Sequence, residues 1–199
     1  MKFEAHKLTR SQFRLLGILP LAFFCAQAIH YWQTNEFGNM LWMCNIGNLL
    51  LALGLFFEQA ILIRVAVIWM VPGLAVWFVY VVPTWGVLLS STLVHVGGFC
   101  VGIGVIRRVR IDSRAWFYAF TWYLIVQLLS RLVTPAELNV NVAHNIQAGW
   151  EHTFSSYLKF WFILTALVGI FLWALGLLLG RLWPAAPTAP LESVRTPGL

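Results

Sequence analysis

The chain is poor in charged side chains. Lysine, arginine, aspartate and glutamate together make up 10% of the 199 residues, whereas 60% are hydrophobic. A soluble globular protein needs more polar surface than this, and here the apolar residues occur in long blocks. The composition excludes a soluble globular fold and predicts an integral membrane protein.

Motifs of other functional classes are also missing. The glycines of GGFCVGIG, at 97–104, lie inside an apolar block and favour close helix packing over phosphate binding. No His-Glu-x-x-His spacing occurs, although His144, Glu151 and His152 leave metal ligation open. We therefore expect no metal and no cofactor. The sequence also contains no internal repeat.

Blocks of about 17 to 24 apolar residues predict an all-α membrane helix bundle with about six spans. The connections are too short for a second domain, so residues 1–183 are expected to form one transmembrane domain. Residues 184–199 are rich in proline and small polar residues, which predicts a disordered cytoplasmic tail. The predicted spans are 15–32, 40–57, 61–82, 85–106, 115–133 and 157–181.

The basic residues predict the orientation of the chain. In the six-span arrangement, Arg131 and Lys159 are alone on one side, and the rest of the 13 basic residues lie on the other. This asymmetry predicts cytoplasmic termini and a multi-pass protein of a bacterial plasma membrane. The start of the chain resembles a secretory signal, but its long basic segment favours an uncleaved anchor. We expect membrane lipid as the partner and no nucleic acid, because the basic residues are split among short segments.

Two predicted spans carry polar side chains at matching depth. Cys44 and Asn48 are one turn apart in the second span, and Ser91 and His95 are one turn apart in the fourth. Cys44 and Ser91 fall roughly 6 to 9 Å below the outer ends, and Asn48 and His95 roughly 12 to 15 Å. Because polar groups are costly in lipid, we expect the two faces to meet inside the bundle.

This cluster contains the side-chain types of a nucleophilic site. A cysteine attacks as a thiolate, and an imidazole nearby can take its proton. We therefore predict Cys44 as nucleophile, His95 as base, and Asn48 as the group that orients the imidazole or donates to an oxyanion. A disulfide between Cys25 and Cys44 is the competing use of this thiol.

The longest connection, between the fifth and sixth spans, supplies further polar residues. Its apolar and polar residues alternate over 138–142, which predicts an extended strip that dips into the outer mouth of the bundle. Arg131 suits an anionic headgroup or Glu137, or simply snorkels to the interface. The predicted substrate-binding residues are Ser91, Arg131, Asn139, Asn141 and His144.

Three segments together resemble the YwaF-like integral membrane proteins. They are LWMCNIGNLLLALGL at 41–55, SSTLVHVGG at 90–98, and a polar outer segment after a further helix. That family is distantly related to androgen-induced-gene hydrolases and to a transmembrane cysteine acyltransferase of lipids. The resemblance covers roughly residues 40–146 and implies Cys44 as nucleophile and His95 as its base.

Two functional hypotheses follow. In the first, the protein is a lipid acyltransferase or hydrolase that uses Cys44 and His95 at a cavity open to the outer leaflet. In the second, it is a non-catalytic membrane subunit or a small ligand-binding or transport module, in which the polar cluster holds helices together. Partner subunits and the oligomeric state stay open in both.

Overall fold

The computed structural model describes residues 9–80 and 88–184, and within these ranges the chain is helical and forms no strand. The prediction of an all-α membrane helix bundle is confirmed. The α- and π-helical elements are α1 (Arg10–Leu15), α2 (Ile18–Gln33), α3 (Met43–Phe56), α4 (Ala60–Tyr80), α5 (Leu89–Thr92), the π-helix η3 (Leu93–Gly97), α6 (Gly98–Val109), α7 (Ala115–Val133) and α8 (Tyr157–Leu182). Short 3₁₀-helices are η1 (Phe37–Leu41), η4 (Ala136–Leu138) and η5 (Val140–Val142).

Five stretches of the described chain are long and apolar enough to cross a membrane. At the predicted second span, 40–57, the structure has a shorter apolar helix, because α3 has only 14 residues. A helix of that length is about 21 Å long, against about 30 Å of bilayer hydrocarbon. Trp42, with φ −56° and ψ 136°, interrupts the helical backbone between η1 and α3. The five spans are Arg10–Gln33, Ala60–Val79, Leu89–Val109, Ala115–Val133 and Tyr157–Leu182.

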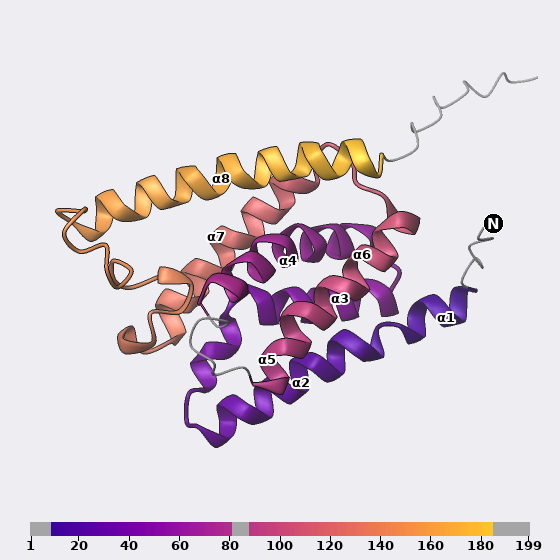
Figure 1. Ribbon diagram of the computed structural model, residues 1–199, viewed down its shortest axis with the longest axis horizontal. Helices are drawn as coiled ribbons and strands as arrows, with labels where there is room; N and C mark the ends of the chain where they lie inside the picture. Colours follow the sequence, from indigo (N-terminus) through magenta and orange to yellow (C-terminus); the bar gives the residue numbers. More distant parts are fainter. Residues whose placement is uncertain (1–8, 81–87, 185–199) are drawn as a thin grey trace, which may run out of the picture.

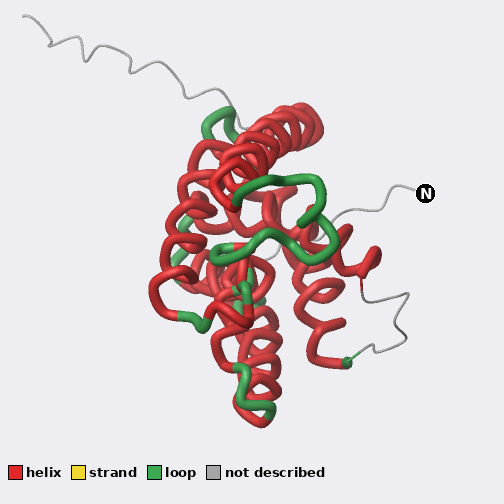
Figure 2. The backbone as a smooth tube through the Cα atoms, turned by 90° about the vertical axis from the view of Figure 1, so that its left-hand side faces the viewer, coloured by secondary structure: helices red, strands yellow, loops and turns green. Residues whose placement is uncertain are grey.

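The helices run back and forth, so that α1 begins and α8 ends at the same end of the bundle (Figure 1). We call this the basic end; it carries residues 57–59 and 110–114. The opposite end, here the loop end, carries residues 34–42 and 134–156. Figure 2 looks at the loop end and shows the long connection before α8 lying across it. The predicted start of the fourth span at Trp85 lies outside the described residues, as does the predicted tail after Pro184.

The packing of the helices leaves α8 at one side. Helix α3 packs on α2 and α4, and α4 packs on α6 and α7, whereas α8 packs mainly on α7 and little on α4. The α3–α4 contact is close, because a Cβ atom at Gly54 would lie 2.7 Å from Ile63 Cγ1. Leu51, Leu55 and Ile63 are fully buried there. The core thus sits around α4, and a space is left between α4 and α8.

The basic end is held by charged side chains. Arg64 of α4 forms an ion pair with Asp112 and donates Nε to the Arg110 carbonyl at 2.7 Å. Glu58, in the turn between α3 and α4, accepts from Arg10 Nε at 2.7 Å and Arg14 Nε at 2.5 Å. These contacts connect α1 and the 110–114 turn to the central helices.

Candidate functional site

His95 lies in a π-helical turn that interrupts the fourth span. Its Nδ1 is 2.8 Å from the Ser91 carbonyl oxygen, four residues earlier. Because a carbonyl oxygen only accepts, Nδ1 must carry the proton. The lone pair of the neutral imidazole is then on Nε2. A π-turn is rare and occurs often at functional sites.

Trp77 of α4 fixes the plane of this imidazole. The two rings stack with centroids 5.8 Å apart and an angle of 19° between their planes. Trp77 Nε1 also donates to Ser91 Oγ at 3.0 Å. Ser91 therefore holds both rings, His95 through its carbonyl and Trp77 through its hydroxyl. A base must be oriented by its neighbours to work, and His95 has such neighbours.

Cys44 is the second residue of α3 and is half-buried. Its Sγ lies 3.9 Å from Asn45 Oδ1, a contact typical of a weak S–H donor. Cys25 and Cys100 are exposed, and all three thiols are free, so the Cys25–Cys44 disulfide does not form. Across the helix interface, a Cβ atom at Gly73 would lie 3.7 Å from Cys44 Cβ. The absence of a side chain at Gly73 leaves room beside the thiol.

Asn48 connects the two polar faces. Its Nδ2 donates to the Cys44 and Val94 carbonyls, both at 2.9 Å, and the side chain is fully buried. Both amide protons are therefore used by backbone acceptors, and none reaches the imidazole or an oxyanion. The α3 and η3 faces meet here, as expected. Asn48 therefore joins α3 to η3.

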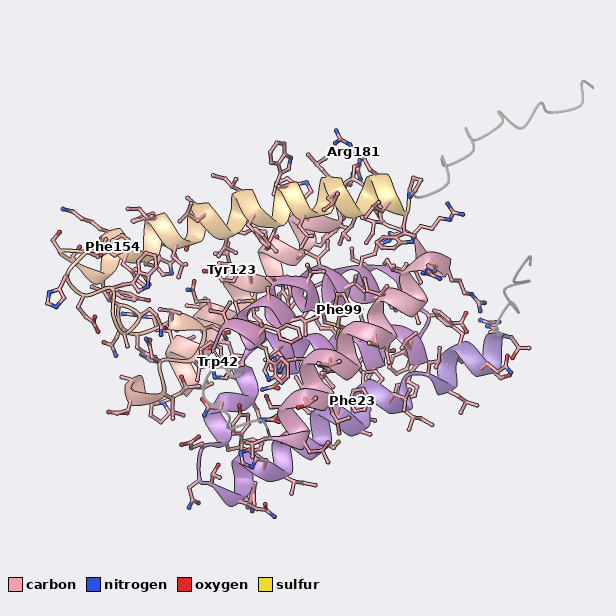
Figure 3. All side chains as sticks on the ribbon, in the orientation of Figure 1. Phe23, Trp42, Phe99, Tyr123, Phe154 and Arg181 are labelled. Carbon is pink, nitrogen blue, oxygen red and sulfur yellow. The ribbon has the colours of Figure 1, made fainter. Side chains whose placement is uncertain are left out.

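Cys44 and His95 line the same cavity, of about 790 Å³. Its wall is mostly aromatic and aliphatic and is formed by α2, α3, α4, α5, η3, α7, α8 and the connection before α8. No lysine, arginine, aspartate or glutamate lines it among the described residues. Figure 3 labels three lining residues, Trp42, Tyr123 and Phe154, in the half of the molecule that carries the loop end. Several lining residues of α4 and α8 are exposed, among them Val76, Ile163, Leu167 and Phe171.

The predicted extended strip at 138–142 is wrong in shape. This segment forms the 3₁₀-turns η4 and η5, with positive φ at Asn139, Asn141 and Val142. It does enter the bundle, since Val140 and Asn141 are buried. Asn141 Oδ1 accepts from the Met43 backbone N–H at 3.2 Å, and Nδ2 donates to the Leu41 carbonyl at 2.7 Å. Buried side-chain hydrogen bonds, which an extended strip would not make here, stabilise the turns.

Only two of the five predicted substrate-binding residues, Ser91 and Asn141, line the cavity. Arg131 donates to the Ala143 carbonyl at 2.7 Å and lies over the Tyr157 ring, so it does not face Glu137. Asn139 Oδ1 accepts from the backbone of His144 at 3.1 Å, and His144 Nε2 is 3.3 Å from Thr134 Oγ1. These three residues hold the loop end together.

Sequence reasoning missed several residues of the cavity wall. Trp77, Tyr31 and Gly73 all line it. Aromatic residues in a membrane helix ordinarily pack or sit at the interface, so neither the tryptophan nor the tyrosine carries a distinctive sequence signal. The sequence leaves metal ligation by His144, Glu151 and His152 open. In the described part of the chain, no group of three or more histidine, cysteine, aspartate or glutamate side chains comes together to hold a metal ion.

We compared the chain with protein-family models, with curated proteins and with solved structures, and found no match in any of the three.

Proposed function

We propose that this membrane protein transfers or hydrolyses an acyl group of a lipid, with Cys44 as nucleophile and His95 as base. The observation that supports the proposal is that the thiol and the imidazole line one apolar cavity inside the bundle. Apolar cavities with a few convergent polar groups are the usual form of a small-molecule site. The resemblance of 41–55 and 90–98 to the YwaF-like proteins suggests the same pair of residues.

The proposed reaction proceeds in two steps. His95 Nε2 takes the thiol proton, and the Cys44 thiolate attacks the ester carbonyl carbon. The C–O bond then breaks, the departing alcohol takes the proton from His95, and a thioester remains on Cys44. Water or a second hydroxyl compound then gives its proton to His95 and attacks the thioester; the S–C bond breaks, the acid or new ester leaves, and the thiolate takes the proton back from His95. Among the described residues no hydrogen bond joins the two side chains; such bonds often tighten only when a substrate binds.

The cavity suits the uncharged part of a lipid. No lysine, arginine, aspartate or glutamate lines its described wall, so a charged headgroup would lack an ion-pair partner inside it. The α8 residues that line it run from Phe160 to Leu172, which corresponds to about 18 Å of helix. One leaflet contributes about 15 Å of hydrocarbon. We infer that an acyl chain lies along α8, with the headgroup near Gln147 and Trp150 at the loop end.

The test is acylation of the purified protein by a long-chain p-nitrophenyl ester, followed by mass spectrometry of the modified cysteine. The proposal expects rapid acylation of Cys44 that is lost in Cys44→Ala and falls on the order of 10²-fold in His95→Gln, because general-base catalysis is worth about that much. Cys100→Ala is the matched control, since Cys100 is exposed and outside the cavity. Equal reaction rates at Cys44 and Cys100 would overturn the proposal.

A second candidate function is lipid binding without chemistry. It is favoured by Asn48, whose amide protons are both used in helix packing, so that the cluster has no third catalytic side chain of the predicted kind. In that case the wild type binds long-chain lipids, and Gly73→Leu, which fills the space beside Cys44, weakens this binding. The long-chain p-nitrophenyl ester would then leave Cys44 unmodified.

A further inference from the structure

Tyr31 lines the cavity that contains Cys44. It lies two residues before the end of α2, and Cys44 is the second residue of α3. The helices α2 and α3 pack against each other and are joined at the loop end by η1. The two side chains are therefore at the same depth, on neighbouring helices, in the wall of one cavity.

The Tyr31 hydroxyl belongs to a group of polar side chains around the thiol. It lies near the side chains of Gln27, Asn45 and Cys44. Gln27 is one turn earlier on α2 and is buried. Asn45 is held by donation of its Nδ2 to the Asn39 carbonyl at 2.9 Å. The phenol thus lies beside the nucleophile, next to two buried amides.

Attack on an ester carbonyl creates a negative charge on the carbonyl oxygen, which needs a hydrogen-bond donor. The described cavity wall has no lysine or arginine. Asn48 gives both amide protons to backbone carbonyls. At the start of α3, the Met43 N–H is bonded to Asn141, and the Asn45 N–H to the Trp42 carbonyl. These groups are already committed, whereas a phenol hydroxyl can rotate its proton toward a new acceptor.

We propose that the Tyr31 hydroxyl donates a hydrogen bond to the oxyanion that forms when Cys44 attacks a carbonyl. This inference rests on the proposed function, because it assigns a donor to that reaction. In the tetrahedral intermediate the thiolate electron pair forms the S–C bond and the carbonyl π electrons move to oxygen. The Tyr31 proton stays on its own oxygen and stabilises that charge. When the carbonyl re-forms and the alcohol leaves, the hydrogen bond weakens again.

The experiment compares two reagents on the same thiol. The long-chain p-nitrophenyl ester reacts through an oxyanion. A long-chain alkyl methanethiosulfonate has no carbonyl; it forms an S–S bond with Cys44 and releases a sulfinate. Both rates are measured for wild type and Tyr31→Phe, which removes only the hydroxyl. Tyr118→Phe, a tyrosine of α7 outside the cavity wall, is the matched control.

We expect Tyr31→Phe to lower the ester rate on the order of 10²- to 10³-fold, the usual cost of losing one oxyanion donor. The thiosulfonate rate should be unchanged, which also shows that the variant is folded and its cavity open. An ester rate equal to that of wild type overturns the inference, and so does an equal fall in both rates, which indicates a structural role. If wild-type Cys44 reacts with the thiosulfonate but not with the ester, the proposed function itself fails, and this inference with it.

Discussion

Substituting Gly98 by alanine should destabilise the bundle through a steric clash with one buried side chain. A Cβ atom at this position would lie 2.5 Å from Asn48 Oδ1, 2.9 Å from Nδ2 and 3.0 Å from Cγ. Asn48 cannot move away freely, because its Nδ2 is bonded to the Cys44 and Val94 carbonyls. Overpacking of this kind costs about 1–3 kcal/mol.

The loss of stability in Gly98→Ala can be measured by thermal unfolding in detergent. For a chain of this size, 1 kcal/mol shifts Tm by about 2–4 °C, so Gly98→Ala should lower Tm by roughly 2–12 °C. Gly104→Ala is the matched control on the same helix, because no atom lies within 4 Å of a Cβ there. That substitution should leave Tm unchanged or raise it slightly, since alanine favours a helix by up to about 1 kcal/mol.

A double variant shows whether Asn48 is the cause. Asn48→Ala alone should lower stability, because it leaves the Val94 carbonyl without its donor; interhelical hydrogen bonds in membranes average about 0.6 kcal/mol. In the Asn48→Ala/Gly98→Ala variant the clash is absent. The loss of stability in this double variant should therefore be smaller than the sum of the two single losses, by about 1 kcal/mol or more. Strict additivity, or a Gly98→Ala protein as stable as Gly104→Ala, would refute the reasoning.

Two further predictions concern the basic end and the cavity. The hydrogen bond from Arg10, assisted by one from Arg14, holds the pKa of the Glu58 carboxyl below its ordinary value of 4.5. The ionised carboxylate is therefore favoured in the folded state, so its contribution to stability is full above pH 4.5 and disappears as the pH falls through the lowered pKa. Thermal unfolding between neutral and acidic pH should show this loss in wild type and not in Glu58→Gln; identical pH profiles would contradict it. In the cavity, Gly73→Leu should slow modification of Cys44 by a long-chain thiosulfonate on the order of 10-fold or more, because the new side chain occupies the space beside the thiol. The reaction of Cys44 with methyl methanethiosulfonate, a small reagent, should be slowed much less. Equal slowing of both reactions would indicate a global change in the structure.

The class of the protein follows from composition alone. A bilayer demands long apolar helices whose backbone hydrogen bonds are satisfied internally, so the apolar blocks predict the all-α bundle directly. The same rule predicts that Cys44, Asn48, Ser91 and His95 should gather inside, because each is costly in lipid. The Asn48 bond to Val94 shows that the two faces do meet.

The details of the site depend on interactions that no local pattern contains. At the π-turn, the Ser91 carbonyl accepts from His95 Nδ1, and this contact decides which ring nitrogen carries the proton. The alternation at 138–142 is typical of an extended strip, yet buried side-chain hydrogen bonds of Asn141 to α3 and α7 stabilise 3₁₀-turns instead.

The sequence therefore determined that the protein lies in a membrane, that its fold is all-α, and which polar residues must be buried away from lipid. These properties depend on side-chain chemistry and helix periodicity. Only the tertiary structure decided that Asn48 packs helices, that Tyr31 and Trp77 join the site, and that a cavity exists. The cavity is present because α8 packs mainly on α7 and little on α4. That spacing is set by contacts between residues far apart in the chain, which a list of residues does not specify.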